Sequence, residues 1–179
     1  MSAEWLTAIS ALATLVVVAI TAFAALRQIR HMRSGNQVAA LLPLVERYRE
    51  AEIQASLNYV LGSLRADMED PEVRAGIRAI PVHGKATAAL AIFNFYESVG
   101  ALVCANALDL ELVLRYFNTP SDMWTIGEQY IAISRESRGD EVFENFEATV
   151  VLQQNYERRH GVSMYPKGLP RLTLPAPPP

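Results

Sequence analysis

The chain begins with a long apolar run. From Trp5 to Leu26, 22 consecutive residues carry no charge. A helix rises about 1.5 Å per residue, so this run would be about 33 Å long as a helix and would match a hydrocarbon core of about 30 Å. The pattern predicts a transmembrane helix that stays attached to the protein.

Two alternatives to this anchor are disfavoured. A buried helix of a soluble protein would show a stripe of charged or strongly polar residues along one face, and the run shows none. A cleaved signal peptide would have a positively charged segment ahead of a shorter apolar run. No lysine or arginine precedes Trp5, and arginines follow Leu26 at once.

The flanking charges predict the orientation. Arg27, Arg30 and Arg33 follow the run, whereas the four residues before Trp5 contain no lysine or arginine. Positive residues accumulate on the cytoplasmic side of a span, so we expect these arginines to determine the topology. The N-terminus would then lie outside the inner (cell) membrane and the body in the cytoplasm. Trp5 suits the outer interface, where indole rings concentrate.

Apolar residues keep a helical spacing beyond the anchor. A stalk is predicted from the stripe formed by Ile29, Met32, Val38, Leu41, Leu42, Val45 and Tyr48. The segment 34–36 (Ser-Gly-Asn) is a candidate interruption, and Pro43 predicts a kink because it removes one backbone hydrogen bond. The next stripe predicts a helix that ends near Arg65.

Capping residues divide the rest into helices. Asp70 followed by Pro71 predicts the start of a short helix carrying Val73, Ile77 and Ile80, which must stop at Pro81. Residue types that cap helix ends predict three further helix starts and two ends, at Asp109, Ser121 and near Asp140, and at Gly139 and Gly161. No segment shows the two-residue alternation of a strand, so the predicted class is all-α.

These patterns predict three parts. Residues 1–33 form the transmembrane anchor and basic neck, residues 34–161 a compact cytoplasmic helical bundle, and residues 162–179 a flexible tail. Six of the ten prolines lie between Pro166 and Pro179, which excludes a helix there. The segment 175–178 matches the PxxP spacing of a polyproline ligand, but we strongly favour a solvated end for a tail of this composition.

A second apolar segment, from Lys85 to Ala107, raises the alternative of a second span. Glu97 lies near its middle, and a charge in lipid costs about 2.5 to 3.5 kcal/mol. A core helix of the bundle avoids this cost, so we expect the segment to lie at the centre of the body.

Charge is unevenly distributed along the chain. Residues 1–33 sum to +2, whereas residues 34–161 hold 18 acidic and 11 basic side chains, a sum of −7. An acidic body repels phosphate backbones, which excludes nucleic acid as the expected partner. Cys104 is the single cysteine, so no internal disulfide can form, and we expect a reduced, buried thiol.

The sequence contains none of the common signatures for phosphate, dinucleotide, hydrolase or zinc-protease sites. Glu157 and His160 have the spacing of one half of a di-iron motif, but such sites need a second copy and two more carboxylates. We therefore assign no catalytic, cofactor-binding or metal-binding residues and expect no cofactor.

Glu97 is the candidate of most interest. A carboxylate on an apolar helix must be paired, hydrogen-bonded or protonated, because burying it alone costs several kcal/mol. One hypothesis pairs it with Arg115, Arg74 or Arg78 as a structural residue. The other makes it a functional acid or ligand. We favour the structural hypothesis because no second catalytic group accompanies it.

Several aromatic and acidic motifs resemble a bacterial family of small membrane-anchored helical proteins whose domain has no assigned function. The similarity rests on 94–97 (Asn-Phe-Tyr-Glu) with Gly100, 108–110 (Leu-Asp-Leu), Tyr116-Phe117, Trp124 and 143–146 (Phe-Glu-Asn-Phe). It covers residues 5–160 and implies one N-terminal span with an α-helical cytoplasmic domain. It brings no catalytic residues and excludes the proline tail.

The leading hypothesis is a membrane-anchored cytoplasmic interaction or regulatory module. Its expected partners are the lipid bilayer and either another protein or a second copy, while the sequence does not identify a small-molecule ligand. One rival is an enzyme that uses acidic residues around Glu97. Another is a small subunit of a larger membrane complex, which would show a wide exposed apolar patch.

Overall fold

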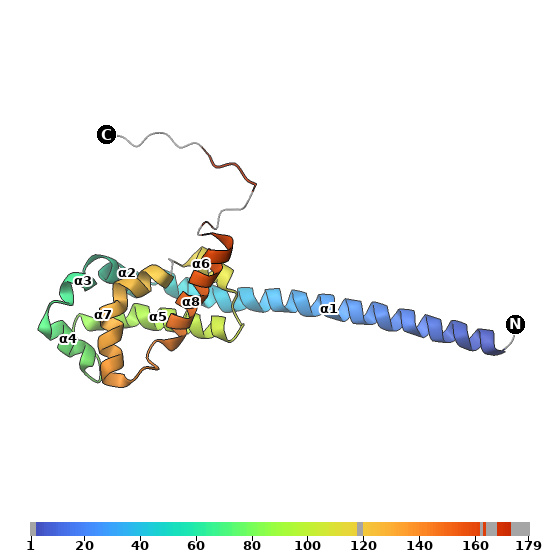
Figure 1. Cartoon of the computed structure of the whole chain (residues 1–179), viewed down its shortest axis with the longest axis horizontal. Coiled ribbons are helices and arrows are strands. Elements are labelled where there is room, and N and C mark those ends of the chain that lie inside the picture. The colour runs from blue at the N-terminus through green and yellow to red at the C-terminus, as the bar shows by residue number, and fades with distance from the viewer. Residues whose placement is uncertain (1–2, 118–119, 162, 164–167, 173–179) are drawn as a thin grey trace. The chain divides into compact units, whose positions relative to one another are not determined.

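The computed structural model describes residues 3–117, 120–161, 163 and 168–172. Across these ranges the chain forms helices and no strands, which confirms the predicted all-α class there. The chain divides into two units, Met1–Glu46 and Arg47–Pro179. Figure 1 labels the helices in chain order.

The first unit consists of one long helix. α1 runs from Ala3 to Arg49 without a break and contains Pro43 in its interior. The predicted interruption at 34–36 is therefore wrong. Each residue inside a long helix adds a hydrogen bond without a new nucleation cost, and this offsets the low propensities of a serine, a glycine and an asparagine in sequence.

Two helices among the described residues are long and apolar enough to cross a membrane. They are Ser10–Ile29 within α1 and Ala86–Cys104. The two differ in burial, because no residue of Ser10–Ile29 is buried, whereas many residues of the second helix lie in the core of the second unit.

The second unit is built around α5. Its helices are α2 (Ala51–Gly62), α3 (Leu64–Asp67), α4 (Pro71–Arg78), α5 (Ala86–Cys104), α6 (Leu110–Tyr116), α7 (Pro120–Arg138) and α8 (Glu144–His160). α5 contacts α2, α4 and α8, and Figure 1 shows α8 crossing it. Neighbours on several sides explain why α5 is apolar almost all round, as expected for a core helix.

Aromatic rings fill the centre of this unit. Phe93 of α5 lies 5.1 Å from Tyr130 of α7, and Tyr96 of α5 stacks on Phe146 of α8 at 5.1 Å between ring centroids. These four side chains are at most 1% exposed. Ring contacts at such distances add stabilisation beyond the burial of apolar area.

Local caps lie where the sequence predicts them. The Asp70 carboxylate accepts a hydrogen bond of 2.8 Å from the backbone N–H of Glu72, and Asp109 accepts one of 2.8 Å from Glu111. Gly139 (φ +104°) and Gly161 (φ +84°) follow the last residues of α7 and α8. Their positive φ values explain why glycine ends both helices.

Two predicted helix starts are wrong. α7 begins at Pro120, so Ser121 lies inside its first turn instead of capping it. The Ser121 N–H instead donates to Gln153 Oε1 of α8 at 3.0 Å. α8 begins at Glu144 and not near Asp140, because Phe143 adopts a left-handed conformation (φ +62°) that interrupts the helix.

The predicted burial of Cys104 is also wrong, and so is the predicted extension of the short helix through Ile80. Cys104 is exposed, since it ends α5 on the same face as the exposed Ala101 and Ala105. Ile80 is 80% exposed because α4 already ends at Arg78. Most of the predicted tail, including the PxxP segment at 175–178, lies outside the described residues.

Candidate functional site

The Glu97 carboxylate binds the beginning of α8. Its Oε2 accepts a hydrogen bond of 2.8 Å from the backbone N–H of Phe146. Its Oε1 accepts bonds of 2.7 Å from the Asn145 side-chain amide and 3.3 Å from the Asn145 backbone N–H. Glu97 is half-buried, so these bonds replace part of its hydration.

The beginning of α8 needs such a hydrogen-bond acceptor. The first N–H groups of any helix lack acceptors within the helix and carry partial positive charge. Phe143 occupies the capping position and has no side-chain oxygen. A carboxylate supplied by α5 therefore performs the role that a local serine or aspartate performs at most helix starts.

Gly100 lets the two helices approach closely. It lies one turn after Glu97 on α5, and a Cβ atom placed on it would lie 2.3 Å from the backbone oxygen of Asn145. Real Cβ atoms do not come this close to backbone atoms. The glycine thus permits the short α5–α8 distance at which the Glu97 side chain reaches the beginning of α8.

The predicted arginine partners of Glu97 bind other groups. Arg115 pairs with Glu111 at 2.6 Å and Arg78 with Glu136 at 2.9 Å. Arg74 donates to the backbone oxygen of Met68 at 2.6 Å. The prediction of an arginine pair is therefore wrong, because a helix N-terminus already supplies the positive partial charge that the carboxylate needs.

Arg135 of α7 holds the turn that precedes α8. Its Nε donates to the Val142 backbone oxygen at 2.9 Å, and its Nη2 lies 2.7 Å from Glu147 Oε2. Its guanidinium also lies over the Trp124 ring, 5.5 Å from the centroid. Arg135 and Glu97 thus both bind residues at the beginning of α8 or in the turn before it.

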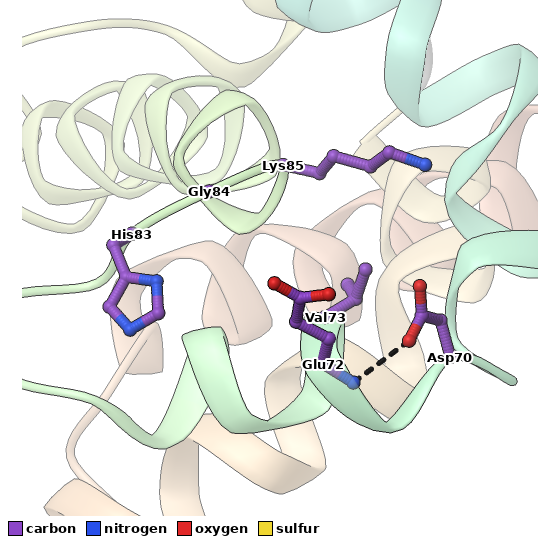
Figure 2. Close-up of a pocket in the computed structure, with 6 residues that line it drawn as sticks. All are labelled: Asp70, Glu72, Val73, His83, Gly84 and Lys85. Carbon is purple, nitrogen blue, oxygen red and sulfur yellow. Dashed lines mark hydrogen bonds between the residues drawn. The ribbon is translucent and has the colours of Figure 1, made fainter.

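A small pocket lies between α4 and the start of α5 (Figure 2). It has a volume of about 200 Å³ and is lined by Asp70, Glu72, Val73, His83, Gly84 and Lys85. In Figure 2 the Lys85 side chain extends away from the His83 ring, toward the side where Asp70 lies. Lys85 Nζ pairs with Asp67 Oδ1 at 3.1 Å.

This pocket mixes charges of both signs on exposed side chains. Within the described ranges there is no group of three or more histidine, cysteine, aspartate or glutamate residues that could hold a metal ion. Sequence reasoning identifies only Asp70 here, as a helix cap, and misses Glu72, His83 and Lys85. These residues follow no motif spacing, so no signal in the sequence would have found them.

The residues expected to set membrane topology lie in α1. Arg27, Arg30 and Arg33 belong to this helix, and Arg27 is exposed. Trp5 is 68% exposed near the start of the same helix.

Comparison with known families identifies the domain. A family model described as a domain of unknown function, DUF4760, matches residues 9–151. The chain belongs to the DUF4760 family. No match to the chain was found among curated proteins or among solved structures.

The DUF4760 match includes both units of the chain. It begins inside the apolar part of α1 and ends in α8, so it contains Glu97, Gly100 and Asn145 together. The expectation of a domain without assigned function is thereby confirmed. The DUF4760 description assigns no activity to these residues.

Proposed function

We propose that this DUF4760 protein is a single-pass inner-membrane protein whose helical body acts in the cytoplasm as an interaction or regulatory module. The observation that carries the proposal is the exposure of Ser10–Ile29, a 20-residue apolar segment in which no residue is buried. Leaving one large apolar side chain in water costs about 1.5 to 3 kcal/mol. A bilayer removes this cost along the whole segment.

The contrast with α5 supports one span instead of two. α5 is also long and apolar, but its large side chains, including Phe93, Phe95 and Tyr96, are buried inside the second unit. Its apolar surface already has protein partners. Moving α5 into lipid would also expose Glu97, whose carboxylate is bonded to α8.

The flanking arginines support a cytoplasmic body. Arg27, Arg30 and Arg33 follow the uncharged run that ends at Leu26, and such residues remain on the cytoplasmic side of a span. The body begins beyond them in the sequence and would lie on the same side.

A module is favoured over an enzyme because of how Glu97 is used. All of its described bonds go to the start of α8, which is a structural role. Large exposed apolar residues of the body, Leu61, Ile80, Tyr116, Val151 and Leu152, come from several separate segments.

The experiment is a topology measurement on the full chain. An alkaline phosphatase fused after Pro179 should be inactive and a β-galactosidase fused there active, and alkaline carbonate should not extract the protein from membranes. Replacing Arg27, Arg30 and Arg33 with asparagine should weaken this orientation, whereas Arg65→Gln in the body should not. An active phosphatase fusion on the unmodified chain would refute the cytoplasmic placement.

A further inference from the structure

The segment of α1 that follows the proposed span carries an unpartnered apolar face. Four large apolar side chains there are about 60% exposed: Ile29 (62%), Met32 (59%), Val38 (59%) and Leu42 (58%). Ile29 is the last residue of the segment Ser10–Ile29, and Met32, Val38 and Leu42 lie beyond the proposed span in water. Exposed apolar groups arranged along one helix indicate a surface that another helix covers.

These residues fit one seven-residue repeat. With Gly35 and Leu42 at position d, Met32 and Ala39 fall at position a. Ile29 and Val38 then fall at the flanking positions e and g. All four exposed apolar residues therefore lie on the face that contacts a partner in a coiled coil.

The charges lie on the opposite face of the same repeat. Arg27, Arg30 and Arg33 occupy positions c, f and b, which point away from a coiled-coil partner. Two copies joined along the a and d positions would thus not bring these arginines together. The charge pattern fits a second copy of this chain, since like charges would oppose pairing if they lay on the shared face.

The repeat continues without a shift into the apolar segment. Position d is occupied at seven-residue intervals by Thr7, Thr14, Thr21 and Gln28, and position a by Ala11, Val18 and Ala25. Most bulky residues fall at b, c and f (Ile9, Leu12, Val16, Ile20, Phe23 and Leu26), whereas Leu15, Val17 and Val18 fall at e, g and a. Small residues on one face allow helix backbones to approach closely in lipid, while bulky ones face the acyl chains.

Two hydroxyl groups on this face already have acceptors within α1. Thr14 Oγ1 donates to the Ser10 backbone oxygen at 2.9 Å, and Thr21 Oγ1 donates to Val17 at 2.8 Å. Thr14 and Thr21 would therefore contribute to pairing through close packing and not through hydrogen bonds to a second copy. Gln28 differs, because its amide at a d position can bond to the same amide of a second copy and so favour parallel pairing in register.

We infer that two copies of this chain pair in parallel along α1, through a left-handed coiled coil that runs from Thr7 to Leu42. The seam spans about five heptads, with alanine, valine or methionine at position a and threonine, glutamine, glycine or leucine at position d. A strict seven-residue repeat produces the left-handed supercoil. The parallel arrangement rests on the proposed function, since two copies inserted the same way in one membrane run in the same direction.

The test is disulfide cross-linking of the full chain in isolated membranes. Cys104→Ser removes the native cysteine, and single cysteines are then introduced at seam positions by Met32→Cys or Gly35→Cys. Ser34→Cys, at position c, is the matched control because it is adjacent and nearly isosteric. Disulfides need Cα atoms within about 7 Å, so oxidation should convert the two seam variants to dimers and leave the control monomeric.

A second measurement detects pairing without cross-linking. In detergent, the full chain should sediment as a dimer, and Met32→Glu together with Leu42→Glu should abolish the dimer because four carboxylates would meet at the seam. Gln37→Glu, at position f, should leave it intact. A monomeric parent chain, or cross-linking that is equal at positions 32, 34 and 35, would overturn the inference and indicate another partner for this face.

The two proposals fail in distinguishable ways. Carbonate extraction of the same membranes reports whether the chain is anchored. A retained chain without seam cross-links overturns the pairing and leaves the anchor standing. A chain released by carbonate overturns the anchor, whatever the cross-linking shows.

Discussion

The Glu97 carboxylate of α5 accepts a hydrogen bond of 2.8 Å from the backbone N–H of Phe146, 49 residues later in the chain. The bond joins the central helix of the body to the beginning of the last one. Because it satisfies N–H groups that no local side chain reaches, we expect it to stabilise the docking of α8 on α5.

Replacing Glu97 tests this role. Glu97→Ala leaves the N–H groups of Asn145 and Phe146 without the carboxylate, and a lost bond to a charged group costs about 1.5 to 3 kcal/mol. We expect a clear decrease in the Tm of the full chain in detergent, measured by near-ultraviolet circular dichroism, which reports the aromatic core. Glu111→Ala removes an exposed ion pair and should change the Tm much less than Glu97→Ala does.

The same series separates a cap from an ion pair. No arginine is left unpaired when Glu97 is removed, so Arg115→Met should not restore the Tm of Glu97→Ala. Restoration would show that the arginine hypothesis is right after all. A Tm of Glu97→Ala equal to or above that of the parent would support a functional role for Glu97, because removing a functional group often leaves stability unchanged or improved.

Gly100 offers an independent test of the α5–α8 contact. Gly100→Ala places a methyl group 2.3 Å from the Asn145 backbone oxygen, so the helices must move apart. Such overpacking typically costs about 1 to 3 kcal/mol. Gly62→Ala is the matched control, since a Cβ at Gly62 meets nothing within 4 Å and alanine is the better helix former. Denaturation in urea should rank Gly62→Ala at or above the parent and Gly100→Ala well below it.

Gln153 of α8 caps the start of α7 across the α7–α8 interface. Its Oε1 accepts from the Ser121 N–H at 3.0 Å, its Nε2 donates to Glu157 at 2.7 Å, and the side chain is 1% exposed. Gln153→Leu leaves the half-buried N–H of Ser121 without its acceptor and should cost about 1 to 3 kcal/mol in urea denaturation. The neighbouring Gln154→Leu, on the exposed face, should be close to neutral. Similar losses for both variants would contradict the capping role.

Local signals explain which parts of the fold could be predicted. Asp70 and Asp109 cap helices two residues away, so their roles are visible in short stretches of sequence. The caps made by Glu97 and Gln153 join residues 48 and 32 positions away, for which spacing carries no information. The arginine hypothesis failed for this reason: the sequence shows that Glu97 needs a partner, but not that the partner is a helix end.

The burial of side chains could also be predicted only in part. The apolar pattern of α5 predicts a core helix, and its large residues are buried. Because the helix is apolar almost all round, the pattern does not show which side stays open, and Cys104 was placed wrongly in the core. Phe143 is a second example, since nothing in the sequence marks a phenylalanine for a left-handed conformation.

The buried tyrosines predict a loss of stability at alkaline pH. Burial raises the pKa of Tyr130 to about 12, and it also raises the pKa of Tyr59 and of Tyr96 above the usual value. An unfolded tyrosine ionises near pH 10, so between about pH 10 and 12 the folded chain holds protons that the unfolded chain releases. The free energy of unfolding is therefore undiminished below about pH 10 and decreases as the pH rises toward 12.

Tyr130 donates to the Ala86 oxygen at 3.2 Å and is fully buried, so Tyr130→Phe should cost about 1 kcal/mol at pH 7. The variant should then lose less stability than the parent above pH 10, and the two urea-denaturation profiles should converge. Tyr116→Phe, at a side chain that is 54% exposed, is the control and should follow the parent. Parallel profiles for Tyr130→Phe and the parent from pH 7 to pH 11 would show that Tyr130 does not drive the alkaline transition.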